Sequence, residues 1–178
     1  MAEQLMRRML EAGYAGAGSK GALWSRIALQ DMSYVFDQLL YEGSIQPGDA
    51  DALEVEFKRF FFLVSTRRQP LAMIGPLVDR VWHQFVLFTE KYSEFCRRTA
   101  GFFVHHRPDT ATTPVPVEAG ENFLRAYEDE FGSLPALWWK GMSPETEAFY
   151  KLRPLRGRPP VRWSGWTGEI APAISRSR

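Results

Sequence analysis

The stretch GPLVDRVWHQFVLFTEKYSEFCRRTAGFFVHHRP, residues 75–108, decides how this chain folds. It holds the only cysteine and all three histidines of the 178-residue sequence. Its apolar residues recur at spacings of three and four, which predicts one amphipathic helix from about Pro76 to Ala100. Gly101 then predicts a reversal of the chain, and the short apolar run after it is expected to be extended. We therefore expect the chemistry of this protein to lie within this stretch.

At 100° per residue, the predicted helix has one apolar face. That face carries Val78, Val81, Trp82, Phe85, Phe88, Tyr92, Phe95 and Cys96. Trp82, Tyr92 and Cys96 are therefore predicted to be structural core residues, with Cys96 acting as a small buried hydrophobe. Cys96 follows His83 by thirteen residues, about 20 Å along an unbroken helix, and points to the other side. We do not expect these two residues to share a metal ion.

The opposite face of the helix carries the candidate site. Asp79 lies one turn before His83, so its carboxylate can accept a hydrogen bond from one ring nitrogen and leave the other nitrogen free. An extended return after the turn would bring His105 and His106 back along the helix, within side-chain reach of Glu90 and of His83. Because side chains alternate along an extended chain, only one of the two histidines would face the helix.

Imidazole and carboxylate groups are ligand types that zinc and iron accept. The side chains of Asp79, His83, Glu90, His105 and His106 therefore predict a transition-metal site, with zinc or iron as the expected ion. Their spacing matches no metal signature such as HExxH or paired CxxC. Two other interpretations stay open, a purely structural role for the histidines and general acid–base catalysis without a metal. If the protein is an enzyme, metal-assisted chemistry on a small molecule is the expected class.

The rest of the chain is predicted to be helical as well. Apolar stripes predict further helices over about 23–41, 47–65, 117–131 and 143–152. We therefore expect an all-α protein, an irregular bundle of about five helices. Three consecutive phenylalanines (60–62) predict that the second of these helices is covered on more than one side. A short helix over 2–12 and a Gly-rich linker over 13–22 are expected before the bundle, and the linker lacks the GKS or GKT of a phosphate-binding loop.

Charge divides the chain into two parts. Residues 1–150 carry a net charge of −5, and residues 151–178 carry +6. We expect a helical domain over 1–152 and a basic, Pro/Arg/Trp-rich tail over 153–178, either disordered or strapped along the body. An acidic body argues against nucleic-acid binding by the domain itself.

The tail gives two alternative functions. One is a non-enzymatic protein–protein interaction module that uses an aromatic surface and the tail. The other is single-stranded nucleic-acid binding, because the tail interleaves arginines with tryptophans. These residues are Arg153, Arg156, Arg158, Arg162, Trp163 and Trp166. A small molecule or a protein remains the expected partner, rather than a nucleic acid.

The composition is that of an ordinary globular domain, with 45% hydrophobic and 24% charged residues. A single cysteine cannot form an internal disulfide, so nothing suggests secretion. No segment approaches the roughly 20 consecutive apolar residues that a membrane helix needs. We therefore expect a cytoplasmic protein.

The run DRVWH (79–83) is followed by tyrosine, cysteine and glycine at positions 92, 96 and 101. This series is similar to the D-x-V-W-H…Y…C…G pattern of plant glycine-rich domain-containing proteins, in the domain that precedes their glycine-rich region. The plant pattern has a second histidine two residues after its Trp-His pair, where this chain has Phe85. A site that uses that second histidine is therefore absent here.

A longer set of runs resembles small uncharacterised bacterial proteins related to that plant domain still more closely. These runs are EFKRF (56–60), PLAM (70–73), VDRVWHQFVLFT, YSEFC and GFFVHHRP. The resemblance covers residues 50–108 and, more loosely, the segment YEDEFG. It implies an α-helical domain built on the Trp-His helix and brings no established reaction with it.

Overall fold

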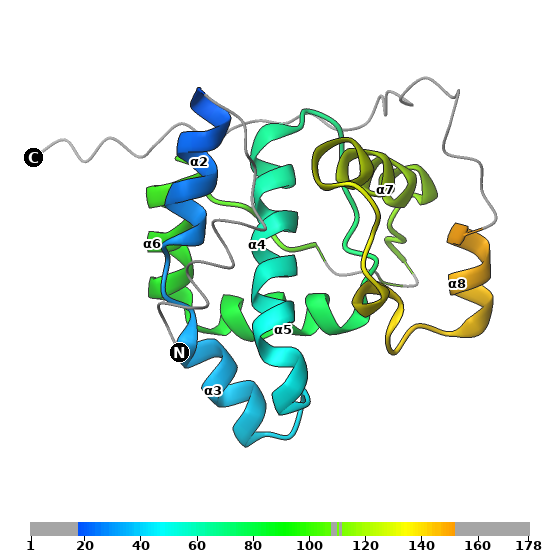
Figure 1. The fold of residues 1–178 in the computed structure, drawn as a ribbon, viewed down its shortest axis with the longest axis horizontal. Helices are drawn as coiled ribbons and strands as arrows, with labels where there is room; N and C mark the ends of the chain where they lie inside the picture. The colour runs from blue at the N-terminus through cyan, green and yellow to red at the C-terminus, as the bar shows by residue number, and fades with distance from the viewer. Residues whose placement is uncertain (1–17, 108–109, 111, 152–178) are drawn as a thin grey trace, which may run out of the picture.

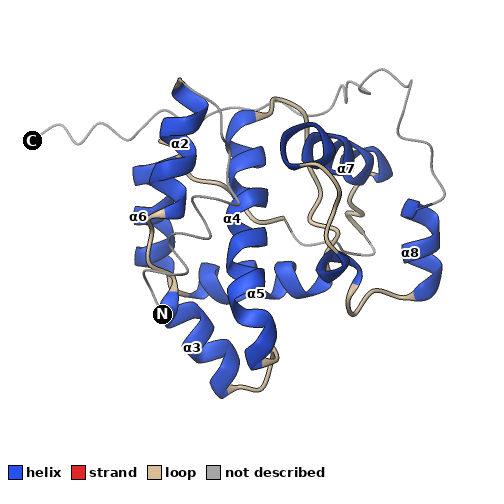
Figure 2. Cartoon of the chain, viewed as in Figure 1, coloured by secondary structure: helices blue, strands red, loops and turns tan. Residues whose placement is uncertain are grey.

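The computed structural model describes residues 18–107, 110 and 112–151. Within these residues the chain forms seven α-helices and two 3₁₀ helices, and no strand. In chain order they are α2 (Ser19–Ala28), α3 (Ser33–Tyr41), η1 (Pro47–Asp49), α4 (Ala50–Thr66), α5 (Pro76–Leu87), α6 (Thr89–Thr99), α7 (Val117–Phe131), η2 (Ala136–Trp139) and α8 (Pro144–Lys151). The predicted all-α, irregular bundle is confirmed (Figure 1, Figure 2).

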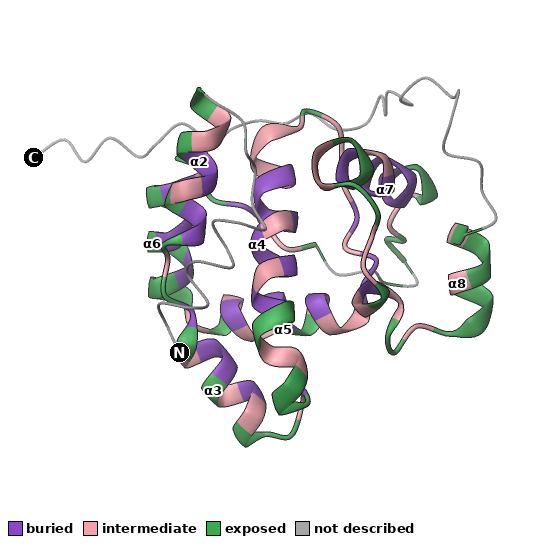
Figure 3. Cartoon of the chain, in the orientation of Figure 1, coloured by how far each residue is buried: buried purple, intermediate pink, exposed green. Residues whose placement is uncertain are grey.

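Helix α4 is the centre of the bundle, and α2, α5 and α7 all contact it (Figure 1). Its three consecutive phenylalanines are all buried, and each meets a different helix. Phe60 packs against Trp82 of α5, Phe61 against Phe95 of α6, and Phe62 against Trp24 of α2. The prediction that this helix is covered on more than one side is confirmed, and its buried surface is visible in Figure 3.

The single helix predicted over 23–41 is wrong, because the structure has two helices there. Helix α2 ends at Ala28, where the buried ammonium of Lys58 donates to the carbonyls of Ala28 (3.0 Å) and Gln30 (2.7 Å). Asp31 then accepts a hydrogen bond from the first backbone N–H of α3 at 2.9 Å. The apolar spacing continues through this break, so periodicity alone does not reveal it.

The single helix predicted over 76–100 is also wrong. Phe88 has φ −82° and ψ 62°, outside the helical region, so α5 ends just before it and α6 begins just after it. The ring of Phe88 packs edge-on against Tyr34 at 5.0 Å. Helix α5 therefore runs across the bundle while α6 lies alongside α2 (Figure 1). These two breaks turn five expected helices into seven.

The second half of the chain follows its prediction closely. Helix α7 has the predicted bounds, and Phe123 and Tyr127 are fully buried on it. Helix α8 begins after Ser143, whose hydroxyl accepts a hydrogen bond from the backbone N–H of Thr146 at 3.2 Å, as expected for a helix N-cap. No helix in the described part of the chain is both long and apolar enough to cross a membrane.

Some predictions fall on residues that the structure does not describe. The helix over 2–12 and the basic tail over 153–178, with its Trp163 and Trp166, lie outside the described residues. The same holds for the tail-based roles in binding protein or nucleic acid. The Gly-rich linker predicted over 13–22 is too long, because α2 already begins at Ser19.

Candidate metal centre

The site is formed where the extended segment 102–107 returns across α5. Gly101 makes the reversal after α6 with φ +82°, a conformation that glycine adopts without strain. The hydroxyl of Tyr92, on α6, then donates to the carbonyl of Val104 at 2.5 Å. The same hydroxyl accepts a hydrogen bond from Trp82 Nε1 of α5 at 2.9 Å. Tyr92 thus ties together α5, α6 and the returning segment.

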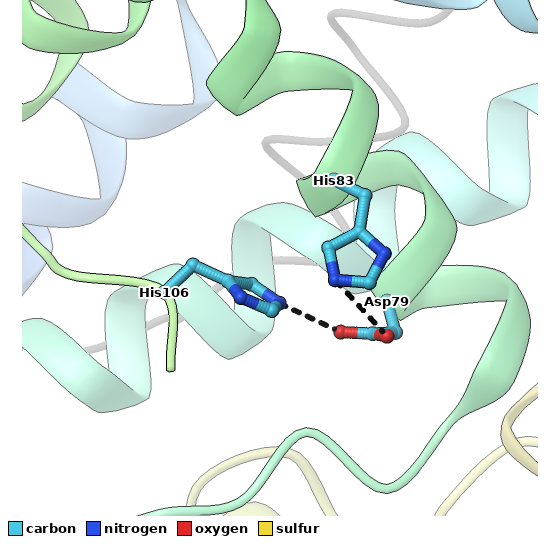
Figure 4. A group of neighbouring side chains, drawn as sticks. All are labelled: Asp79, His83 and His106. Atoms are coloured by element: carbon cyan, nitrogen blue, oxygen red, sulfur yellow. Dashed lines mark hydrogen bonds and ion pairs between the residues drawn. The ribbon is translucent and has the colours of Figure 1, made fainter. Parts of the chain in front are cut away.

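Three side chains converge beside this junction: Asp79 and His83 of α5, and His106 of the returning segment (Figure 4). His106 Nε2 donates to Asp79 Oδ1 at 3.0 Å. His83 Nε2 lies 3.7 Å from the other carboxylate oxygen, Oδ2, too far for a hydrogen bond. The two imidazole rings are 4.3 Å apart. Each residue offers one ligand atom, and all three atoms lie within 4.8 Å of one another.

Burial falls steadily across this group. The His106 side chain is 11% exposed, that of Asp79 32% and that of His83 55%. The indole of Trp82 packs edge-on against His106 at 4.5 Å and is itself buried. The group therefore has a closed side at Trp82 and an open side at His83.

The structure does not bring the other two expected ligands into this group. His105 is exposed and its ring packs against Phe103 at 4.9 Å, so only His106 of the pair faces the helix, as the alternation of an extended chain requires. Glu90 is exposed on α6. We expected Glu90 to lie near the histidine pair because we predicted one unbroken helix. The helix breaks at Phe88, and the returning segment lies against α5 instead.

The expected hydrogen bond from His83 to Asp79 is wrong as well. The carboxylate of Asp79 accepts its hydrogen bond from His106, which is 27 residues away in the sequence. His83 sits close to the same carboxylate without a hydrogen bond to it. The Asp79–His83 spacing correctly indicated that the two residues are neighbours. The hydrogen bond to Asp79, however, comes from His106.

The predicted core residues Trp82, Tyr92 and Cys96 are all buried. Burial raises the pKa of the Cys96 thiol, an effect that contacts with the backbone of Val104 and with Tyr92 partly offset. Burial likewise raises the pKa of the Tyr92 hydroxyl. Both groups are therefore protonated at neutral pH, and Cys96 is not part of the Asp–His–His group.

A buried carboxylate on α4, that of Glu56, was not predicted from the sequence. Glu56 is 4% exposed and accepts hydrogen bonds from Tyr127 (2.6 Å), Trp138 Nε1 (2.7 Å) and Arg59 (2.9 Å). A signal was present, because position 56 falls at helical spacing between the buried residues 53 and 60. This carboxylate thus accepts hydrogen bonds from side chains of three elements, α4, α7 and η2.

A second concave surface lies between α8 and the segments before α5 and α7. It has a volume of about 510 Å³ and is lined by Ala72, Met73, Ile74, Val115, Val117, Glu145, Thr146, Phe149 and Tyr150. Among the described residues, this lining contains one carboxylate, Glu145, and no histidine or cysteine. The Asp–His–His group is therefore the stronger candidate for chemistry.

Fold and site together define a helical protein with an Asp–His–His group at its surface. A family model described as UCP032817-like matches residues 34–129, more than half of the sequence, and the chain belongs to this family. The matched region contains all three residues of the group. Comparison with curated proteins and with solved structures finds no match. The family match does not bear on the likeness to plant glycine-rich domain-containing proteins, which stays a prediction.

Proposed function

We propose that this protein binds a divalent transition-metal ion through Asp79, His83 and His106. The observation that carries the proposal is the convergence of these three side chains, from two separate segments, to within 4.8 Å. Imidazole suits zinc, iron, copper and nickel, and one carboxylate beside two imidazoles is common at zinc and iron centres. Zinc and iron are the ions that we propose first.

The spacing of the ligand atoms supports this proposal. Metal–ligand bonds of about 2.0–2.2 Å place neighbouring ligand atoms roughly 3.0–3.5 Å apart. The Asp79–His106 distance of 3.0 Å falls within this range, and the Asp79–His83 distance of 3.7 Å is slightly above it. These two distances end on different oxygens of Asp79, and the three ligand atoms lie within 4.8 Å of one another, so binding one ion requires the exposed His83 ring to rotate toward the other two groups.

The competing explanation is structural. In that case the hydrogen bond between Asp79 and His106 would only hold the returning segment against α5. A structural role of this kind involves only Asp79 and His106. It assigns no function to His83, whose exposed ring lies 4.3 Å from the His106 ring. His83 is therefore the residue that separates the two explanations.

The test uses the full-length protein without a histidine tag, stripped of metal and titrated with zinc by calorimetry. We expect one ion per chain in the unaltered protein. Loss of a group that merely supports a ligand weakens metal binding by about 10–100-fold, so Asp79→Asn, His83→Ala and His106→Ala should each weaken it by about 100-fold or more. His105→Ala is the matched control, because His105 is a neighbouring exposed histidine outside the group. It should bind zinc as the unaltered protein does.

Two results would overturn the proposal. One is the absence of stoichiometric zinc binding. The other is binding that survives His83→Ala and His106→Ala but not His105→Ala. A thermal shift gives an independent check, since a ligand at 100 times its Kd stabilises the folded state by about 2.7 kcal/mol. Zinc should therefore raise the Tm of the unaltered protein but not that of His83→Ala.

A further inference from the structure

We infer that the metal ion held by Asp79, His83 and His106 binds a small anionic ligand from solution on its exposed side. This inference rests on the proposed metal site and adds the class of ligand that the site takes. It distinguishes a centre that can act on a small molecule from one that only stabilises the fold.

The described residues of the protein supply only three of the ligands that such an ion needs. The group contains one carboxylate and two imidazoles, and no fourth His, Cys, Asp or Glu of the described residues joins it. Zinc in structural sites has four protein ligands, whereas catalytic zinc has three and keeps one position for water or substrate. Iron with two histidines and one carboxylate keeps more positions for other ligands. Three ligands from this chain thus leave at least one position to a group from solution.

The coordination position that the protein leaves open lies on the exposed side of the group. Trp82 covers the group on its buried side, where its indole lies 4.5 Å from the His106 ring. On the other side, more than half of the His83 side chain is exposed. The remaining position therefore faces solvent, and a ligand can enter without any movement of the helices.

The net charge of the ion and its protein ligands also favours an anion. Histidine binds metal as a neutral imidazole, so a divalent ion with one carboxylate keeps a net charge of about +1. A surface position on such an ion favours an anion over a neutral molecule. Small carboxylates and inorganic anions therefore fit both the charge and the exposed geometry.

The test uses cobalt(II), because its visible absorption bands report the ligands around it, and azide as the probe anion. The full-length protein is loaded with one equivalent of cobalt and titrated with azide. We expect a saturable change in the cobalt spectrum, equal in the His105→Ala control. Free cobalt in the same buffer at the same azide concentrations provides the baseline.

The outcomes separate the two proposals. If cobalt does not bind, the metal site itself is wrong, and this inference falls with it. If cobalt binds in one equivalent but its spectrum ignores azide, the metal site stands and the inference is wrong. Asp109, three residues after His106, lies outside the described residues, and Asp109→Asn tests it as a fourth ligand. An azide response seen only in Asp109→Asn would show a site closed by the protein and would overturn the inference.

Discussion

Glu56 and Asp79 are carboxylates in different surroundings, and the contrast between them shows how a structural carboxylate differs from a candidate metal ligand. Glu56 is 4% exposed and accepts three hydrogen bonds of 2.6–2.9 Å from Tyr127, Trp138 and Arg59. The Asp79 side chain is 32% exposed and accepts one hydrogen bond of 3.0 Å, from His106. The His83 ring lies close to the Asp79 carboxylate but forms no hydrogen bond with it.

The number of free acceptor positions separates the two carboxylates. A buried carboxylate is tolerated when its oxygens are fully hydrogen-bonded, and the donors around Glu56 meet that need. Glu56 also lies in the core, away from solvent. Asp79 keeps acceptor capacity on Oδ2, which lies 3.7 Å from the exposed imidazole of His83. Glu56 thus lies in the core, and Asp79 is the carboxylate that we propose as a metal ligand.

The largest expected difference lies in stability. Glu56→Ala removes the shared acceptor of the Tyr127 hydroxyl, the Trp138 indole and the Arg59 guanidinium, and removing one side of a buried ion pair typically costs about 3–5 kcal/mol. Asp79→Ala removes one partly exposed hydrogen bond and should cost about 1 kcal/mol or less in metal-free protein. Urea unfolding of both variants measures the difference. Equal losses would remove the distinction between the two carboxylates.

Tyr92→Phe should have the next largest effect. It removes the hydroxyl that links Trp82 of α5 to Val104, and it leaves one buried donor and one buried acceptor unpaired. The expected loss is about 1–3 kcal/mol. Because His106 follows Val104 by two residues, zinc affinity should also fall although no ligand has changed. Calorimetry would contradict this if the variant lost stability but bound zinc with unaltered affinity.

Alkaline pH tests both regions together. Burial raises the pKa of Tyr127, beside Glu56, and of Tyr92, and it raises the pKa of Tyr34 to about 12. The unfolded chain ionises its tyrosines near pH 10, so their contribution is complete below that pH and is lost as pH rises above it. Above pH 10, each further pH unit should lower the free energy of unfolding by about 1 kcal/mol for each fully buried tyrosine. Because Tyr41 is exposed, tyrosinate absorption is compared between the unaltered protein and Tyr92→Phe, and a difference already present near pH 10 without unfolding would contradict this.

The smallest effect is expected at Glu90, the carboxylate that the sequence placed near the histidines. It is exposed on α6 and outside the group. Glu90→Gln should change stability by less than about 0.5 kcal/mol and leave zinc affinity unaltered. A marked loss of zinc binding would mean that the returning segment reaches further along the helix than the structure shows.

Strong apolar stripes made the fold largely predictable. Helices α4 and α7 follow stripes of large side chains, and their bounds agree with the predicted ranges within a few residues. The breaks at residues 29–32 and at Phe88 were missed because the apolar spacing continues across them. Lys58, which caps the first break from another helix, is a tertiary contact that local spacing does not encode.

Three of the five candidate residues, Asp79, His83 and His106, come together in the structure, whereas Glu90 and His105 do not. The spacing of Asp79 and His83 placed them together, and alternation required one histidine of the pair to face the helix. Which one faces it depends on the register set by Tyr92 and Val104, which is a contact between segments. Glu56 went unrecognised because its donors come from α7 and η2, far along the chain.

The sequence separation across the site has a consequence for the entropy of the chain. Asp79 and His106 are 27 residues apart, so an ion bound to both acts as a cross-link that closes a loop of that length. By the relation used for disulfides, closing such a loop removes unfolded-state entropy worth about 3.5 kcal/mol at 25 °C. That loop contains most of α5, the break at Phe88, all of α6 and the returning segment. In hydrogen exchange, these residues should open as one unit in metal-free protein and become protected together when an ion closes the loop.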